Sequence, residues 1–330
     1  MKPEPLLRAL ADGKPHSGED LARALGVTRA AVWKQVAKLA QFGLDVNASP
    51  GIGYRLARRI DLLDAESLRG DLPVNVAARI ARLEVFTELG STNRHLLDCD
   101  PPSPGTLDVC IAEYQTAGRG RRGRRWTTPL GGGLCLSVAW RFADVPLQLS
   151  ALTLATGVVV RRVIERVSGV RIALKWPNDL VWDERKLGGI LLELQGEAQG
   201  GCHVVTGIGL NVALPPRSLA ALSDWPRGAV DLQSASGGGA LPARAALAAA
   251  LIEGLADLFS SYAAAGFSAY RADWREADYL QGRRITIDDA AGPVSGIALG
   301  IDGDGALLLE TEAGERRRVI SGDVSVRAAT

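Results

Sequence analysis

The sequence contains few of the residues that hold transition metals. Its 330 residues include three histidines (His16, His95, His203) and four cysteines (Cys99, Cys110, Cys135, Cys202). The histidines lie far apart in the chain, and the cysteines form no C-x-x-C pair. A zinc or iron enzyme is therefore not expected. The cysteines are typical of buried thiols in a reducing cytosol rather than of a disulfide framework.

Long apolar runs are also missing. No run reaches the roughly 20 apolar residues that a membrane-spanning helix needs, and the N-terminus lacks the apolar core of a secretory signal. We therefore expect a cytoplasmic protein without membrane contact. With 330 residues, of which 47% are hydrophobic, the chain is long enough for two or three domains around a sizeable core.

Charge is distributed unevenly along the chain. Residues 1–60 carry ten Lys/Arg and five Asp/Glu, a net charge of +5, whereas the whole chain has a net charge of +1. A basic block on a nearly neutral body is typical of a region that meets an anionic partner. A solvated basic face has the same composition, so charge alone does not decide between the two.

The first sixty residues predict a winged helix-turn-helix. One short helical pattern ends at Gly13, a second runs from a Ser17 N-cap to Gly26, and a third runs from a Thr28 N-cap to Gly43. Two short strand patterns around a Pro-Gly turn follow and would form the wing. Helices joined by such a short turn are typical of DNA-binding domains.

The third helix would turn an apolar face inward and small or basic side chains outward. The residues predicted to lie in the major groove of DNA are Thr28, Arg29, Ala30, Trp33, Lys34 and Lys38. A helical protein-interaction domain is the alternative, but a basic face without an acidic stripe favours DNA. We expect this domain to span residues 1–62 and to end in a charged connector, "RRIDLLDAESLRGDL".

From about residue 80 the patterns of strands and helices are mixed, which predicts an α/β domain over residues 63–272. Within it, "IALKWPNDLVW" reads as one strand and "ARAALAAALIEGLADLFSSYAAAG" as a helix. Residues 273–330 contain short strand patterns separated by Gly and Asp turns. That spacing is typical of a small β-barrel or sandwich.

The loop "TAGRGRRGRRW", residues 116–126, spells the dinucleotide-binding string G-x-G-x-x-G. That fingerprint must open a helix, but Pro129, three consecutive glycines and a strand pattern follow instead. A kinase is excluded because the strings HRD and DFG do not occur. Five crowded arginines indicate a site that pairs carboxylate or phosphate. A basic surface loop is the alternative.

Polar residues and glycines gather in "GSTN", "KWPND", "KLGGILLE" and "GIGLNV". Lys186 is followed by glycines, which let backbone approach a ligand closely, and "GIGLNV" offers another such approach. Ser91 and Thr92 lie at a strand-to-helix turn, where plain N-capping is by itself the better explanation for them. Asp179 follows a proline and also fits a turn residue.

Taken in order, "GSTN", "YQTAGRGRRGRRW", "KWPNDL", "KLGGIL" and "GIGLNV" resemble the bacterial biotin–protein ligases of the bifunctional kind, which also repress the biotin biosynthesis operon. The resemblance covers nearly the whole chain. It implies an α+β multidomain fold with a winged helix-turn-helix, a catalytic domain related to class II aminoacyl-tRNA synthetases and lipoate ligases, and a small SH3-like β-barrel. It implies biotin, ATP and Mg²⁺ as ligands. The implied partners are a biotin carboxyl carrier domain, operator DNA and a second copy of the chain.

The resemblance also implies roles for individual residues. The biotin-binding residues would be Ser91, Thr92, Asn93, Gln115, Arg119, Gly120, Arg121 and Lys186. The adenylate-binding residues would be Arg121, Trp126, Lys186 and Asn211. The catalytic residues would be Lys186, Asp179, Arg119 and Arg121, with Asp179 as the candidate base. No protein ligand is implied for Mg²⁺.

One segment departs from the family pattern. Residues 213–227, where the family's adenylate-ordering loop lies, match only in position and in Trp225. Two alternatives stay open: a ligase whose helix-turn-helix does not bind DNA, and a biotin-sensing transcription factor without ligase activity. The presence of Lys186 and Asp179 argues against the pure sensor, because a sensor needs no base.

Overall fold

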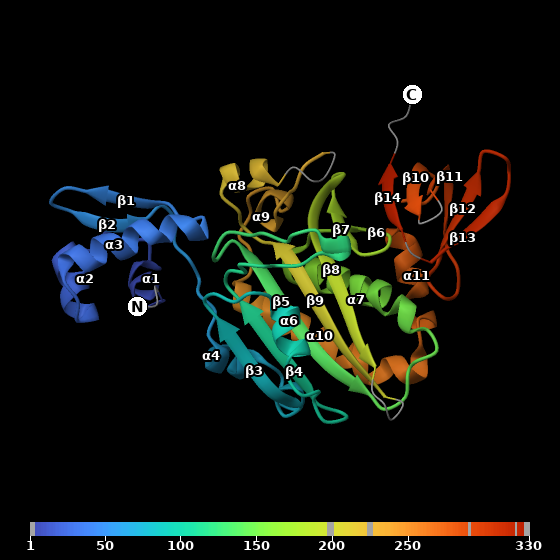
Figure 1. Ribbon diagram of the computed structural model, residues 1–330, viewed down its shortest axis with the longest axis horizontal. Helices are drawn as coiled ribbons and strands as arrows, with labels where there is room; N and C mark the ends of the chain where they lie inside the picture. Colours follow the sequence, from blue (N-terminus) through green and yellow to red (C-terminus); the bar gives the residue numbers. More distant parts are fainter. Residues whose placement is uncertain (1–3, 197–200, 223–226, 290–291, 321, 327–330) are drawn as a thin grey trace.

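The computed structural model describes residues 4–196, 201–222, 227–289, 292–320 and 322–326. Three units lie side by side along the long axis of the molecule (Figure 1). The N-terminal helices and their hairpin are at one end, a seven-stranded sheet with its helices is in the middle, and a five-stranded sheet is at the other end.

The N-terminal unit is a winged helix-turn-helix, as predicted. Its elements are α1 (Glu4–Leu10), α2 (Gly18–Leu25), α3 (Arg29–Leu39), the 3₁₀ turn η1 (Ala40–Phe42), and the hairpin β1 (Val46–Ser49) and β2 (Gly53–Leu56). The Ser17 and Thr28 hydroxyls accept hydrogen bonds from the backbone N–H groups of Asp20 and Ala31, so both predicted N-caps are present.

The charged stretch after the wing corrects one prediction. It is not a connector, because it contains α4 (Ala65–Asp71), capped by Asp64, and is followed by α5 (Val74–Ala77). Leu63, Leu68 and Leu72 are buried in the core of the middle unit. Leu68 and Leu72 are four residues apart and so lie on one helical face, which the charged residues between them obscure in the sequence.

The middle unit is built on a sheet with strand order β3-β4-β5-β9-β8-β7-β6, in which β3 and β4 are parallel and the other pairs are antiparallel. The strands are β3 (Ile80–Phe86), β4 (Leu107–Ala112), β5 (Gly133–Phe142), β6 (Ala173–Lys175), β7 (Asp179–Trp182), β8 (Arg185–Gly196) and β9 (Cys202–Asn211). The stretch predicted as a single strand is therefore two strands, β6 and β7. A cis peptide bond between Trp176 and Pro177 lies in the turn between them, where proline, which has no N–H, costs the sheet no hydrogen bond.

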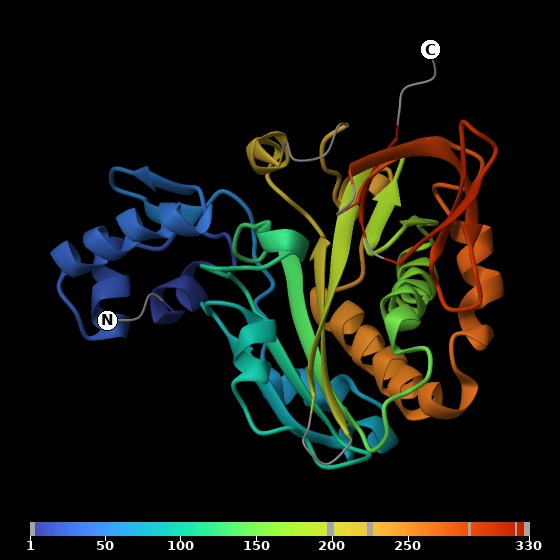
Figure 2. The same ribbon diagram turned by 45° about the vertical axis from the view of Figure 1, so that its right-hand side comes forward.

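Helices cover both faces of this sheet (Figure 2). On one face α7 (Leu152–Ser168), preceded by the 3₁₀ turn η3 (Leu149–Ala151), packs with α10 (Arg244–Ala265) and α11 (Ser268–Ala277). On the other face α6 (Thr92–Leu97) packs over β4, β5 and β9. Successive residues of β4 point to opposite faces of the sheet. Val109 is buried in the large core, whereas Cys110 is buried in a small cluster with Leu96 of α6.

Helix α10 is long and rich in alanine and leucine. Of the described helices, it is the one long and apolar enough to cross a membrane by length and composition. Its alanines raise the mean hydropathy without forming a run of large apolar residues. Leu251, Ile252 and Leu255 are fully buried in the core of the middle unit, so α10 is the central core helix of this fold.

The C-terminal unit is a five-stranded antiparallel sheet with strand order β13-β12-β11-β10-β14, as expected for the small barrel. Its strands are β10 (Arg284–Asp289), β11 (Gly292–Ile301), β12 (Leu307–Thr311), β13 (Arg316–Val319) and β14 (Asp323–Val326). Residue 272, the predicted domain boundary, lies inside α11, whose Trp274 is buried in the core shared with the middle unit. We propose that the boundary lies between α11 and β10.

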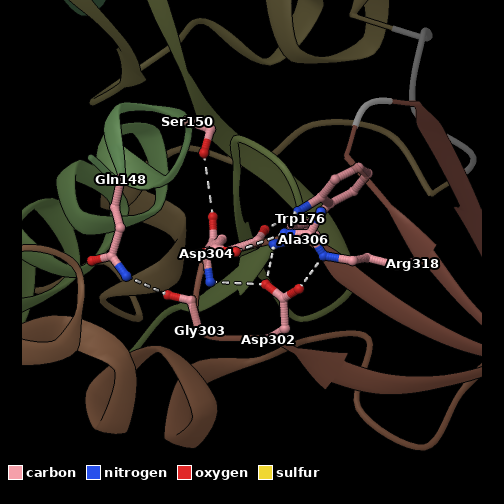
Figure 3. Close-up of polar contacts among 9 residues, drawn as sticks. Gln148, Ser150, Trp176, Asp302, Gly303, Asp304, Ala306 and Arg318 are labelled. Atoms are coloured by element: carbon pink, nitrogen blue, oxygen red, sulfur yellow. Dashed lines mark hydrogen bonds and ion pairs between the residues drawn. The ribbon is translucent and has the colours of Figure 1, made fainter. Parts of the chain in front are cut away.

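One turn of the C-terminal unit, residues 302–306, docks it on the middle unit (Figure 3). The Trp176 indole N–H donates to the Gly305 carbonyl oxygen at 3.0 Å. The Ser150 hydroxyl donates to the Asp304 carbonyl oxygen at 3.4 Å, and the Gln148 side-chain amide donates to the Gly303 carbonyl oxygen at 3.0 Å. The turn thus holds Trp176 directly before the loop that leads to Asp179.

Candidate active site

A cavity of about 910 Å³ lies between the middle sheet, the arginine loop and the C-terminal unit. All the predicted ligand-binding and catalytic residues line it: Ser91, Thr92, Asn93, Gln115, Arg119, Gly120, Arg121, Trp126, Asp179, Lys186 and Asn211. The chain thus brings together residues that are more than one hundred positions apart. Their individual roles stay predictions.

The polar residues at the start of α6 form one hydrogen-bonded group in this cavity. Gln115 Oε1 accepts from the backbone N–H of Thr92 at 2.8 Å and from its hydroxyl at 3.2 Å. The Ser137 hydroxyl, fully buried on β5, lies 2.6 Å from both Thr92 Oγ1 and Asn93 Oδ1. Ser91 caps α6, so its capping role is real, and it also lines the cavity. Ser137 was not predicted, since β5 reads in sequence as a plain apolar strand.

The arginine loop folds over the cavity without opening an α-helix. It contains only the short 3₁₀ turn η2 (Arg121–Gly123) before β5, so the dinucleotide-binding reading is excluded by geometry. Arg119 Nη1 lies 3.0 Å from Glu193 Oε1, and Arg122 Nη2 donates to the Asp288 carbonyl of β10 at 3.2 Å. The loop thus contacts both the sheet and the C-terminal unit.

Asp179 and Lys186 form an ion pair in the cavity, with Lys186 Nζ 2.6 Å from Asp179 Oδ1. They stand on the antiparallel neighbours β7 and β8, where Gly189 lies opposite Asp179. The backbone of Lys186 is paired with the segment after the 213–227 region, since Lys186 N–H donates to Gly228 O at 3.1 Å. Lys175, opposite Asp179 on β6, also lines the cavity and is largely buried. Lys175 is the first residue of the "KWPND" motif, so the motif could have identified it in the sequence.

Two glycines of β9, Gly207 and Gly209, line the cavity and each also leaves room for a neighbouring side chain. That their backbone approaches a ligand stays a prediction. A Cβ atom at Gly209 would lie 2.5 Å from Trp126 Cε2, and one at Gly207 would overlap Asn93 Oδ1. The bare backbone at Gly209 and Gly207 thus leaves room for Trp126 and Asn93, which line the cavity. Asn211 donates from Nδ2 to Val230 O at 3.1 Å, and its buried Oδ1 has no hydrogen-bond partner within the described ranges.

Glu184 gathers arginines from two other segments at the cavity, a feature that sequence reasoning missed. Its carboxylate lies 2.7 Å from Arg227 and 3.0 Å from Arg283. The hydrogen bond from Arg283 lowers the pKa of Glu184 the most. Cys135 lines the cavity as well, and burial raises its pKa to about 12, so it is a neutral thiol.

Three family descriptions match the chain in the order of its units. A helix-turn-helix domain matches residues 4–55, the biotin/lipoate A/B protein ligase family matches residues 86–211, and the biotin protein ligase C-terminal domain matches residues 281–327. The bifunctional ligase/repressor BirA of Salmonella typhimurium is 38% identical over 330 residues, covering 99% of this chain and 98% of its own length. The chain belongs to the family of bifunctional biotin–protein ligases and repressors.

Further relatives of this ligase agree. The biotin–[acetyl-CoA-carboxylase] ligase of Mycobacterium tuberculosis is 37% identical over 270 residues, covering 79% of this chain and 95% of its own. The structure of the biotin protein ligase from Aquifex aeolicus in complex with biotin and ATP has a TM-score of 0.62 at 26% identity, covering 76% of this chain and all of that one. The predicted fold and class of activity are confirmed, with biotin and ATP as the substrates.

In this ligase the predicted DNA-contacting residues share one exposed surface. Thr28, Arg29, Ala30, Trp33, Lys34 and Lys38 are all exposed, at the start of α3 and along it. Trp33 exposes 61% of its surface, which is unusual for a large aromatic side chain without a partner to cover it. Thr28 also caps the helix, so its hydroxyl has a structural role in addition. Residues 223–226, including Trp225, lie outside the described residues.

Proposed function

We propose that this ligase makes biotinyl-5'-AMP at the Asp179–Lys186 pair and then transfers the biotinyl group to a lysine of a biotin carboxyl carrier domain. In the first step, the biotin carboxylate attacks the α-phosphorus of ATP and pyrophosphate leaves. In the second step, the lysine amine attacks the carbonyl carbon and AMP leaves. The observation that supports this most directly is the cavity, which combines the ion pair, the arginine loop and a buried polar group.

The positive side chains of the cavity give the first step its physical basis. A carboxylate and a triphosphate repel each other, so cations must offset their charge as the two approach. Lys186, Lys175 and Arg121 all line the cavity. The mixed anhydride must then be kept from water, which gives the loop that folds over the cavity a function.

The second step needs a proton acceptor. A lysine amine has a pKa near 10.4 in water, so it must lose a proton before it attacks. The Asp179 carboxylate lines the cavity, where an incoming amine would take the place of Lys186 as its partner. We infer that Asp179 accepts this proton or orients the amine.

We infer that Mg²⁺ enters with ATP. Among the described residues, no three His, Cys, Asp or Glu side chains gather as a metal site. This fits Mg²⁺, which proteins usually hold through one or two carboxylates and the substrate phosphates. Asp179 and Glu184 line the cavity and would supply such carboxylates, while Mg²⁺ would offset phosphate charge.

For regulation, we infer that the ligase acts in the cytoplasm and binds operator DNA as a homodimer, with α3 in the major groove. The net charge of +5 over residues 1–60 and the exposed face of α3 support DNA binding. The middle sheet ends in two edge strands, β3 and β6, and an edge strand can pair with a second copy. The four cysteines are free thiols, in keeping with a reducing compartment.

The enzymatic part is tested by incubating the ligase with biotin, ATP, Mg²⁺ and a carrier domain. We expect pyrophosphate release and a carrier domain heavier by one biotinyl group. Lys186→Ala should abolish pyrophosphate release, because it removes the cation between the two anions. Lys14→Ala, an exposed lysine of the winged-helix domain, is the matched control and should behave as wild type. Unchanged pyrophosphate release by Lys186→Ala would exclude Lys186 from this role.

A further inference from the structure

We propose that Glu193 is a positioning residue that couples the arginine loop to the polar group that receives biotin. It would hold the loop closed over the adenylate without touching the reacting atoms. This inference rests on the proposed function and adds to it the side chain that controls how long the reactive intermediate is retained.

The carboxylate of Glu193 bridges two parts of the cavity. Its Oε1 lies 3.0 Å from Arg119 Nη1 on the arginine loop. Its Oε2 accepts a hydrogen bond from Asn93 Nδ2 on α6, also at 3.0 Å. Each oxygen therefore serves a different segment, and these segments are separated by more than twenty residues in sequence.

From Asn93 the contacts continue into the polar group of the cavity. The Ser137 hydroxyl lies 2.6 Å from Asn93 Oδ1 and 2.6 Å from Thr92 Oγ1. Thr92 in turn contacts Gln115. A continuous set of polar contacts thus leads from the loop, through Glu193, to the residues proposed to bind the ring of biotin.

The two ends of this set differ in how firmly they are held. Asn93 is 3% exposed, donates also to Leu191 O at 3.0 Å, and fits against the bare backbone of Gly207. The Arg119 side chain is 46% exposed and stands on a loop. Glu193, 19% exposed on β8, therefore joins a half-exposed arginine on a loop to a buried amide.

This geometry predicts that the loss of Glu193 affects the retention of the adenylate but not the stability of the fold. An ion pair with one half-exposed partner contributes little to the stability of the fold, so its loss should leave the protein intact. The same loss removes the charge-assisted contact that holds Arg119 in place, so the loop should open more often. A purely structural role would instead change stability and activity together.

The test is the release of synthetic biotinyl-5'-AMP from the full-length ligase, followed in a chase experiment. Glu193→Gln should release it about tenfold faster than wild type, because the amide has no charge for Arg119. Its unfolding temperature should stay within about 2 °C of wild type. Glu193→Asp keeps the charge on a shorter side chain and should release the adenylate at an intermediate rate.

Two comparisons sharpen the result. Glu253→Gln removes a carboxylate that pairs with Arg166 outside the cavity, at 3.4 Å, and should release the adenylate as wild type does. The double variant Arg119→Ala/Glu193→Gln should be no faster than Arg119→Ala alone, because both changes remove the same contact.

The outcomes separate the coupling from the proposed function. If wild type holds the adenylate and Glu193→Gln holds it equally long, the coupling is wrong and the ligase function stands. If faster release in Glu193→Gln comes with a matching loss of stability, the role is structural and the coupling is also wrong. If wild type does not hold the adenylate at all, the proposed function itself fails.

Discussion

At the scale of single residues, two glycines of β9 decide how the cavity is divided. Gly207 and Gly209 are two positions apart, so they face the same side of the strand. Gly207 leaves room for Asn93, and Gly209 leaves room for the ring of Trp126. One residue of the proposed biotin-binding region and one of the proposed adenylate-binding region therefore each need a glycine, without a Cβ atom, on β9.

Alanine at either glycine should impair one substrate and spare the other. Gly209→Ala should displace Trp126 and raise the KM for ATP about tenfold, equivalent to about 1.4 kcal/mol. Gly207→Ala should displace Asn93 and raise the KM for biotin by a similar factor. Steady-state pyrophosphate release measures both. Equal effects of either variant on both substrates would contradict this division of the cavity.

At the scale of elements, the turn of residues 302–306 links the C-terminal unit to Trp176, in the turn before Asp179 (Figure 3). Gly305 has a φ of +81°, and a Cβ atom there would lie 2.8 Å from Ala151 Cβ and from Leu154 Cδ1. Asp302 shapes the turn, since its Oδ1 accepts from the backbone N–H groups of Asp304 and Ala306 at 2.9 Å. The turn can dock only if residue 305 has no side chain.

Gly305→Ala should therefore undock the turn and release Trp176. We expect the unfolding temperature to fall by several degrees and the rate of adenylate formation to fall with it. Gly314→Ala is a close control, because Gly314 has a φ of +79° in the next turn of the same unit but nothing within 4 Å of a Cβ atom. The control should lose stability from backbone strain but keep the rate. Equal rates in both variants would exclude a role for this docking in catalysis.

Elements also show what the sequence could and could not predict. The caps of Ser17 and Thr28, the absence of a helix after Gly123 and the helix starting at Thr92 follow from local patterns, and the structure has them. The contacts that couple these elements join residues far apart in the chain. Glu193 contacts Arg119 and Asn93 because the fold places β8, beside β9, close to the arginine loop and to α6. No spacing in the sequence encodes such a meeting.

At the scale of the whole molecule, the winged-helix unit is packed against the chain segment that follows the arginine loop. Leu130, four residues after Trp126, is buried in the core of the winged-helix domain, and its N–H donates to Phe42 O at 2.9 Å. Arg58, after the wing, donates to Ala213 O at 3.0 Å, at the start of the 213–227 region. The winged helix therefore contacts the chain beside both segments proposed to order around the adenylate. We infer that ligand binding reaches α3 through these contacts.

If α3 enters the major groove, its lysines should contribute to DNA binding and not to ligation. Lys34→Ala and Lys38→Ala should each weaken binding to an inverted-repeat operator, because each removes a phosphate or base-edge contact. For a lost phosphate contact, the slope of log affinity against log salt should fall in magnitude by about one.

Filter binding with and without biotinyl-5'-AMP measures this effect, and the mass of the carrier domain reports ligation in the same preparations. Arg8→Ala is the control, because Arg8 is an exposed basic residue of α1 that pairs with Glu4 at 3.1 Å. The two lysine variants should ligate biotin as wild type does, since both side chains are exposed on α3 and neither lines the cavity. If their operator binding and its salt dependence matched those of Arg8→Ala, the exposed face of α3 would be a protein-binding surface, and the chain would be a ligase whose helix-turn-helix does not read DNA.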